Sequence, residues 1–128
     1  MQLDKNRKNL GLTLIEMSVV VAIIGILYVT VIPMYSTTIQ RTRETALRED
    51  LQVMRKVIDQ YYKDHHSWPV DLPTLVSAGY LRAIPADPIT QKTDTWITLP
   101  SESGSRDVFD VQSGAPGKSL DGGLYTEW

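Results

Sequence analysis

One acid stands alone in a part of the chain that otherwise carries no charge, and its chemistry most needs an explanation. Glu16 is followed by 23 uncharged residues, Met17 to Ile39. A carboxylate costs roughly 2.5 to 3.5 kcal/mol at the centre of a bilayer and less near its surface. We therefore expect Glu16 to have a specific partner. The alternative is a side chain that only reaches the lipid headgroups.

The other residue types exclude most site chemistry. The sequence has no cysteine, which rules out disulfides, cysteine-ligated zinc and a thiol nucleophile. His65 and His66 are adjacent and would point about 100° apart on a helix, so they cannot form an i, i+4 metal pair. No nucleophile elbow, phosphate loop or metal-ligand run is present. The net charge is −2 with no dense basic patch. We predict neither enzyme activity nor a nucleic-acid partner.

The uncharged segment is long enough to cross a membrane as a helix. Its 23 residues would extend roughly 35 Å at about 1.5 Å per residue, against about 30 Å of hydrocarbon. A signal peptide is the alternative, but its apolar core has about 7–15 residues and ends at a small-residue cleavage site. The residues after Ile32 read Pro33-Met34-Tyr35-Ser36, a poor site of that kind. The pattern favours a transmembrane helix.

Basic residues before this segment favour a cytoplasmic N-terminus. Residues 1–11 carry Lys5, Arg7 and Lys8 against Asp4, a net charge of +2. Positive charge is retained on the cytoplasmic side of membrane helices. Three arginines also follow the segment within ten residues, although acids surround them. Charge alone therefore gives only a weak orientation preference.

The residues from Gly11 to Leu27 resemble the class III leader of type IV pilins and type II secretion pseudopilins. The motif reads Gly11-Leu12-Thr13-Leu14-Ile15-Glu16-Met17 and continues as an aliphatic run. In that family a prepilin peptidase cuts after the glycine and methylates the new N-terminal amine. The resemblance implies cleavage between Gly11 and Leu12 and N-methylation of Leu12. Removal of 11 of the 128 residues leaves 117. Leu12 stands where the family usually has Phe, which we expect the peptidase to tolerate.

Cleavage there would place a positive charge close to Glu16. The new amine of Leu12 lies four residues before Glu16, about 6 Å along a helix. Between staggered subunits, Glu16 of one protomer can pair with the Leu12 amine of its neighbour. In a low-dielectric environment this pair would fix the axial register of a filament. We therefore assign Glu16 and Leu12 to filament assembly.

Two residues are predicted weak points of this helix. Pro33 removes a backbone hydrogen bond and clashes with the preceding turn, which predicts a kink or local melting. Gly25 has low helix propensity and lets another helix approach closely. In the resembled family, the corresponding residues mark where the stem bends or unwinds inside the filament. The alternative is that both are simply tolerated within a membrane helix.

The helix continues past the membrane as an amphipathic segment. One apolar stripe has spacings of 4, 3, 4 and 3, and the opposite face is charged. The stripe consists of Leu47, Leu51, Met54, Ile58 and Tyr61. We expect later residues of the same chain to cover it. A coiled coil is the alternative, but the stripe extends for barely two heptads.

Shorter elements are predicted after this helix, which should end near 64–67. Asp71 as N-cap, Pro73 in the first turn and Gly79 as a stop predict a short second helix. Residues 95–99 and 107–112 alternate like half-buried strands of a small antiparallel sheet, and 113–123 is a loop by composition. This pattern predicts an α+β fold. Together with the leader it resembles the type IV pilin-like fold, a long N-terminal helix packed on a small sheet.

The second half of the chain resembles general secretion pathway protein G, the major pseudopilin. The likeness lies in residues 68–88 and Asp94-Thr95-Trp96. It implies a leader at 1–11, a membrane and filament-core helix at 12–40 and a periplasmic head at 41–128. Major pseudopilins often bind calcium in the C-terminal loop. Here Pro116 stands where an aspartate is usual, which leaves Asp121 as the main carboxylate for a calcium site. The alternative is a turn in which Asp121-Gly122 supplies the bend.

The resemblance implies a structural subunit rather than an enzyme. It would polymerise from the bacterial inner membrane into a pseudopilus that drives type II secretion, with the N-terminus cytoplasmic and the head periplasmic. Its partners would be other copies of the chain, the prepilin peptidase, the secretion platform and minor pseudopilins. A type IV pilin and a minor or competence pseudopilin are alternatives. A tethered periplasmic binding module that never polymerises is a further one.

Overall fold

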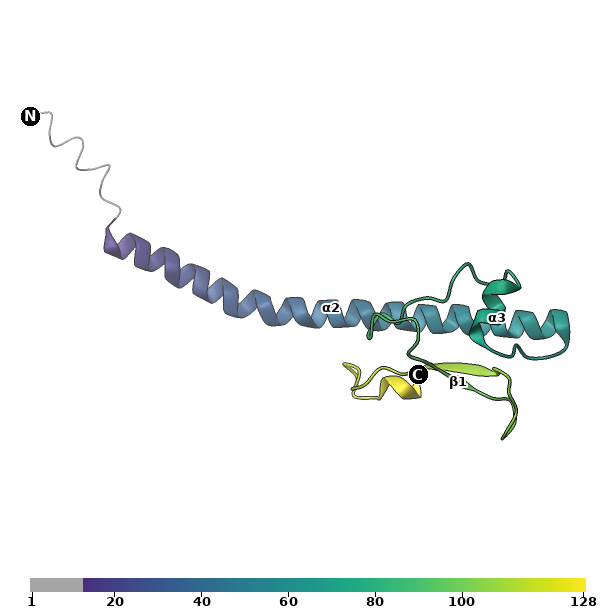
Figure 1. Ribbon diagram of the computed structural model, residues 1–128. Coiled ribbons are helices and arrows are strands. Elements are labelled where there is room, and N and C mark those ends of the chain that lie inside the picture. The colour runs from purple at the N-terminus through teal and green to yellow at the C-terminus, as the bar shows by residue number, and fades with distance from the viewer. Residues whose placement is uncertain (1–12) are drawn as a thin grey trace, which may run out of the picture. The chain divides into compact units, whose positions relative to one another are not determined.

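The computed structural model describes residues 13–128, in the element order α2, α3, β1, β2 and η1 (Figure 1). Helix α2 runs from Leu14 to His65 and has 52 residues. The chain divides into two compact units after Ile39. We call residues 14–39 the stem and residues 40–128 the head. Gly11 and Leu12, the predicted cleavage and methylation positions, lie outside the described residues.

The head is built on the apolar stripe of α2. Leu47, Leu51, Met54 and Ile58 are all buried, with at most 2% of their surface exposed, and Tyr61 packs against this core. Burial of side chains of this size contributes about 1.5–3 kcal/mol each. The predicted stripe is confirmed, as is its cover by the same chain. The predicted helix end is also confirmed, because α2 ends at His65.

Helix α3 runs from Leu72 to Ser77 and begins as predicted. The Asp71 carboxylate accepts a hydrogen bond from the Thr74 amide at 2.8 Å, which satisfies a free donor of the first turn. The Thr74 hydroxyl also donates to this carboxylate, at 2.6 Å. The hydroxyl first and the amide second hold the pKa of Asp71 below its usual range. Gly79 follows with a φ of 86°, a conformation that favours glycine. Leu72 and Leu75 turn into the core.

A two-stranded antiparallel sheet completes the predicted α+β, type IV pilin-like fold. Strand β1, Trp96–Leu99, pairs with β2, Asp110–Ser113. The second strand begins three residues later than predicted. The Asp107 carboxylate accepts from the Ser101 amide, and the Val108 amide donates to the carbonyl of Pro69 at 2.8 Å. Asp107 and Val108 are therefore bonded outside the β1–β2 ladder, and the strand begins only at Asp110.

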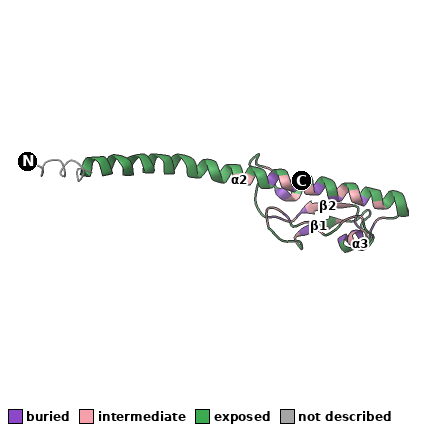
Figure 2. Ribbon diagram, turned by 90° about the horizontal axis from the view of Figure 1, so that it is seen from above, coloured by how far each residue is buried: buried purple, intermediate pink, exposed green. Residues whose placement is uncertain are grey.

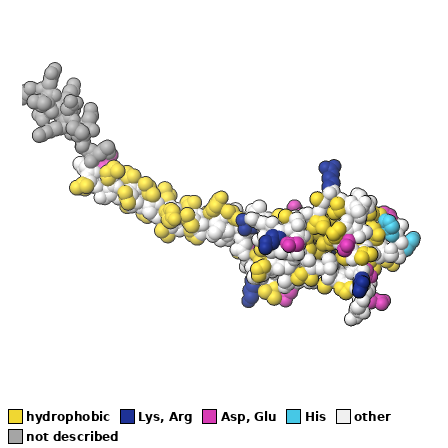
Figure 3. Space-filling model, viewed as in Figure 1, with side chains coloured by type: hydrophobic (Ala, Val, Ile, Leu, Met, Phe, Trp, Pro, Cys, Tyr) yellow, Lys and Arg dark blue, Asp and Glu magenta, His cyan; other side chains and the backbone are white. Residues whose placement is uncertain are grey.

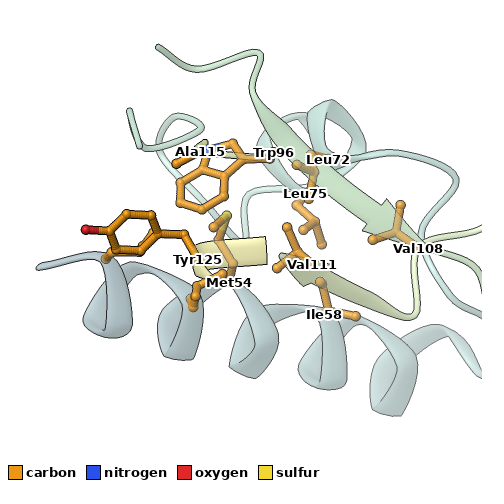
Figure 4. Close-up of a cluster of buried hydrophobic side chains, with 11 residues drawn as sticks. Met54, Ile58, Leu72, Leu75, Trp96, Val108, Val111, Ala115 and Tyr125 are labelled. Atoms are coloured by element: carbon orange, nitrogen blue, oxygen red, sulfur yellow. The ribbon is translucent and has the colours of Figure 1, made fainter. Parts of the chain in front are cut away.

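The inner face of the sheet, the residue Val108 just before β2 and the chain after the sheet close the core. Figure 4 shows their side chains turned toward Met54 and Ile58 of α2. The residues involved are Trp96, Val108, Val111, Ala115 and Tyr125. Tyr125 opens the short 3-10 helix η1, Tyr125–Glu127. Gly114 follows β2, where any Cβ would collide with the carbonyl oxygen of Thr95. A larger residue cannot take its place without moving β1.

A buried acid, Asp87, fixes the loop before the sheet. It has no exposed surface, and its carboxylate accepts from the Ile89 amide at 2.8 Å and from the Ser113 hydroxyl. The Asp87 amide donates to the carbonyl of Lys92, and the Asp87 carbonyl accepts from the amide of Gln91. Burial of a carboxylate requires such donors. The contacts attach the loop to the end of β2.

At the end of α2, the Tyr80 hydroxyl donates to the Asp64 carboxylate at 2.6 Å. This hydrogen bond holds the pKa of Asp64 below its usual range and raises the pKa of Tyr80 to about 12. The Tyr61 ring stacks on His65 at 4.1 Å and meets Tyr80 edge-on. His65 thus takes the predicted helix-end role. Its Nδ1 lies 3.1 Å from the Tyr61 carbonyl oxygen.

We predict that Tyr80→Phe raises the pKa of Asp64 toward its ordinary value. The substitution removes the hydroxyl whose hydrogen bond lowers that pKa most. A carboxyl whose pKa is depressed in the folded state contributes stability above its unfolded pKa and loses it as pH falls through the folded pKa. NMR titration of the Asp64 side chain measures the change. Tyr62→Phe is the control, since the Tyr62 ring stacks on Trp68. An Asp64 midpoint unchanged by Tyr80→Phe would contradict the assignment.

Candidate assembly site

Glu16 lies in the first turn of α2, where Thr13 caps the helix. The Thr13 hydroxyl accepts a hydrogen bond from the Glu16 amide at 3.4 Å, and the Thr13 carbonyl accepts from Met17. Thr13 and Glu16 thus have the T-x-x-E spacing of a capping box. The positive end of the helix dipole also favours an acid there. We did not predict the Thr13 cap from the sequence, although the spacing between Thr13 and Glu16 is that of a capping box.

The Glu16 side chain is exposed. Its predicted partner, the amine of Leu12, lies outside the described residues, so the proposed pairing stays a prediction. What the structure adds is the position of the acid. It lies one turn into a capped helix, at the start of the apolar surface.

The stem is apolar on all sides, and none of the described residues of its own unit covers it. Figure 2 shows residues 14–38 exposed throughout, and Figure 3 shows hydrophobic side chains along them. Leu14 is 88% exposed, and Val29 and Met34 are each 73% exposed. By length and composition α2 contains a stretch that can cross a membrane, and none of that stretch is buried. Exposed apolar surface of this extent marks contact with lipid or protein.

The serine and threonine hydroxyls of the stem donate to carbonyl oxygens of the helix itself. Ser18 donates to the Leu14 carbonyl at 2.6 Å, and Thr30 donates to the Ile26 carbonyl at 2.8 Å. Both Ser36 and Thr37 donate to the carbonyl of Pro33. Because of these intrahelical bonds, the side chains need no polar partner in their surroundings.

The structure keeps the stem helical through Gly25 and Pro33. Pro33 has no amide hydrogen, so the carbonyl four residues earlier lacks its usual donor. A Cβ on Gly25 would meet nothing within 4 Å, so that position lies open. Melting at these two residues, which the sequence predicts for the filament, is not part of this structure and stays a prediction.

A shallow apolar hollow of about 320 Å³ lies on one face of the stem. Its lining residues follow one helical stripe: Ile24, Leu27, Tyr28, Val31 and Ile32. Spacings of 3 and 4 create the grooves that receive side chains of a second helix. This face can therefore take another apolar helix.

The surroundings of Asp121 do not match a calcium site. Calcium takes about six to eight oxygen ligands. The Asp121 carboxylate is mostly exposed and lies 3.5 Å from the guanidinium of Arg48. Within residues 13–128 no three His, Cys, Asp or Glu residues are grouped as metal ligands. The loop does hold one buried side-chain oxygen without a partner, the Ser119 hydroxyl. Apart from main-chain carbonyls, the loop thus offers one carboxylate and one unpartnered hydroxyl, which leaves most of the roughly six to eight positions without a side-chain oxygen.

Comparisons with known proteins agree with the stem motif. A family model described as the prokaryotic N-terminal methylation motif matches residues 6–31. This range includes Gly11, Leu12 and Glu16. No solved structure gives a significant match.

Several relatives align with nearly the whole chain. Type II secretion system core protein G of Escherichia coli K12 is 30% identical over 97% of this chain and 88% of the relative. The protein of the same name from Vibrio cholerae is 29% identical over 96% of both chains. Fimbrial protein EcpC of Eikenella corrodens is 34% identical, but over only 48% of this chain and 40% of the relative.

Proposed function

The chain belongs to the type II secretion system core protein G family, and we propose that it polymerises through its stem into a pseudopilus that drives protein export. The observation that carries this proposal is the stem, an apolar helix with a single acid in its capped first turn. The relatives that align with nearly the whole chain are named as core proteins of a type II secretion system. The proposal assigns a function to the uncovered apolar surface.

Two environments can cover the stem in turn. Before assembly, lipid covers it, since the uncharged segment is long enough to span a bilayer. After assembly, the stems of other copies cover it. We place the protein in the bacterial inner membrane with its N-terminus cytoplasmic and its head periplasmic. The basic leader supports this orientation.

Processing by a prepilin peptidase prepares the assembly contact. Cleavage after Gly11 would remove the leader and leave a methylated amine on Leu12. That amine could pair with Glu16 of a neighbouring copy. Two unit charges 4 Å apart attract by about 4 kcal/mol at an effective dielectric constant of 20. The pair would thereby select one axial register. Minor pseudopilins and the secretion platform are the further partners that this role implies.

A type IV pilin is the second candidate function. The similarity to a fimbrial protein supports it, but covers less than half of either chain. The similarity to core protein G extends over the head as well. The head therefore favours secretion over a surface pilus. A tethered binding module would leave the stem motif without a use.

We predict that Glu16→Gln reduces fibre formation on the order of a hundredfold or more, because one partner of a buried charge pair is lost. Glutamine keeps the size of the side chain and can still act in a capping box. Thr13→Ala removes the capping hydroxyl but keeps the charge, so we expect it to retain fibres. Electron microscopy of overexpressing cells and a secretion assay measure the effect.

Glu49→Gln serves as the control, since Glu49 is an exposed acid of α2 within the head. Mass spectrometry of each variant should show the processed chain, which separates assembly from cleavage. Normal fibres with Glu16→Gln would refute the charge pair. Equal loss with Thr13→Ala would assign the effect to the cap instead.

We also predict that substitution of Gly11 by a bulky residue leaves the chain at 128 residues, whereas the parent chain matures to 117 residues with a methylated Leu12. The glycine is what the peptidase requires in this family. Mass spectrometry of the membrane fraction distinguishes the two. Gly25→Ala is the matched control, because a Cβ there meets no atom within 4 Å. A methylated Leu12 in the Gly11 variant would rule out this cleavage assignment.

A further inference from the structure

The C-terminal segment, residues 118–128, folds back on itself through its own main chain. The Ser119 amide donates to the carbonyl of Gly123 at 2.7 Å, and the Gly122 amide donates to the carbonyl of Ser119. Gly122 has a φ of 89°, which completes the turn. Lys118 and Leu124 form an isolated bridge across it. The turn therefore closes without an ion.

Glu44 binds this segment from α2. It is 5% exposed, and its Oε1 accepts from the Leu120 amide at 2.9 Å and from the Tyr125 hydroxyl at 2.8 Å. Gln40 of the same helix donates to it as well, at 3.2 Å. Hydrogen bonds to an ionised acceptor are roughly twice as strong as neutral ones. A buried carboxylate with one of its donors removed is costly, so these contacts depend on one another.

Two arginines on the same helix face hold the rest of the segment. Positions 44, 48 and 55 fall within about 40° of one another on a helix of 3.6 residues per turn. Arg55 donates to the carbonyls of Trp128 and Val111, at 2.7 and 3.0 Å, and to the Asp110 carboxylate. The Arg48 guanidinium lies 4.3 Å from the centre of the Trp128 ring, a cation–π contact. Arg55 is thus half-buried against the segment rather than on a solvated face.

The polarity of this contact is opposite to that of a cation site. A calcium loop turns carboxylates and carbonyl oxygens toward the ion. Here the segment turns an amide hydrogen and a phenol toward the helix, and the helix supplies the anion. The carboxylate of the loop, Asp121, faces an arginine. A calcium ion at Asp121 would therefore compete with the Arg48 guanidinium for the carboxylate.

We propose that Glu44, with Arg48 and Arg55, fastens the C-terminal segment to α2 in place of the calcium ion that the family resemblance implies, so that the head of this chain is stable without the metal. The proposal does not depend on filament formation. It concerns what holds the head together, and its test is carried out on unassembled protein.

Trypsin provides a direct test on the full chain in detergent micelles. Lys118 is exposed, and cleavage after it releases residues 119–128 only once the segment has opened. We expect Glu44→Gln to accelerate this cleavage about tenfold, since it weakens the bonds to Leu120 and Tyr125. Cleavage after the exposed Arg106 is the internal reference and should be unchanged. Mass spectrometry of the released peptides gives both rates.

Calcium and a chelator are then compared on the parent chain. We expect the same cleavage rate after Lys118 in millimolar calcium and in excess chelator. Ser119→Ala should leave the rate unchanged, because the hydroxyl it removes has no partner. Glu49→Gln is the control for charge alone. Protection by calcium would overturn the proposal. Equal acceleration after Lys118 and Arg106 in Glu44→Gln would also overturn it, because Glu44 would then support the whole head.

Discussion

The rest of the structure depends on one constraint. The single helix α2 must be stable in two different surroundings, an apolar one along the stem and the folded head. In the stem, α2 is apolar on every side and exposed. Such a helix is stable in lipid or among similar helices. In the head, α2 buries one apolar stripe, and α3, the sheet and the residues after the sheet pack against it. The change from all-round to one-sided apolarity follows the division after Ile39. One side of the helix then suffices to organise a folded head.

Features that depend on neighbouring residues in the chain could be predicted from the sequence. The buried stripe, the Asp71 cap and the turn at Gly79 depend on spacing and on residue type, and the structure confirms each. The predicted start of β2 was wrong because the Val108 amide donates to the carbonyl of Pro69, nearly 40 residues earlier. No local pattern reports such a partner. Glu44, Arg55 and Asp87 were missed for the same reason. Charged residues on a helix or in a loop are usually solvated, and only long-range contacts bury them.

The acid of the stem illustrates how a residue can have two compatible functions. Within one chain, Glu16 follows the Thr13 cap at the spacing of a capping box. In an assembled filament, the same carboxylate would be available to an amine of a neighbouring copy. The observed cap joins the Glu16 amide to the Thr13 hydroxyl and uses neither oxygen of the carboxylate. A carboxylate has two oxygens and about four acceptor positions. The cap therefore leaves the acid available for pairing and does not compete with it.

The polar groups of the stem show why assembly through this surface would need a charge pair. The hydroxyls of Ser18, Thr30, Ser36, Thr37 and Thr38 donate to carbonyl oxygens of their own helix. Apart from Glu16 and the phenols of Tyr28 and Tyr35, the other side chains of the stem are aliphatic or methionine thioethers. Dispersion and hydrophobic contacts between aliphatic helices are non-directional. One helix can slide past another by a turn with little change in such contacts. A charge pair at one end changes steeply with displacement. The proposed pair at the single acid would therefore fix the axial position that the aliphatic surface leaves open.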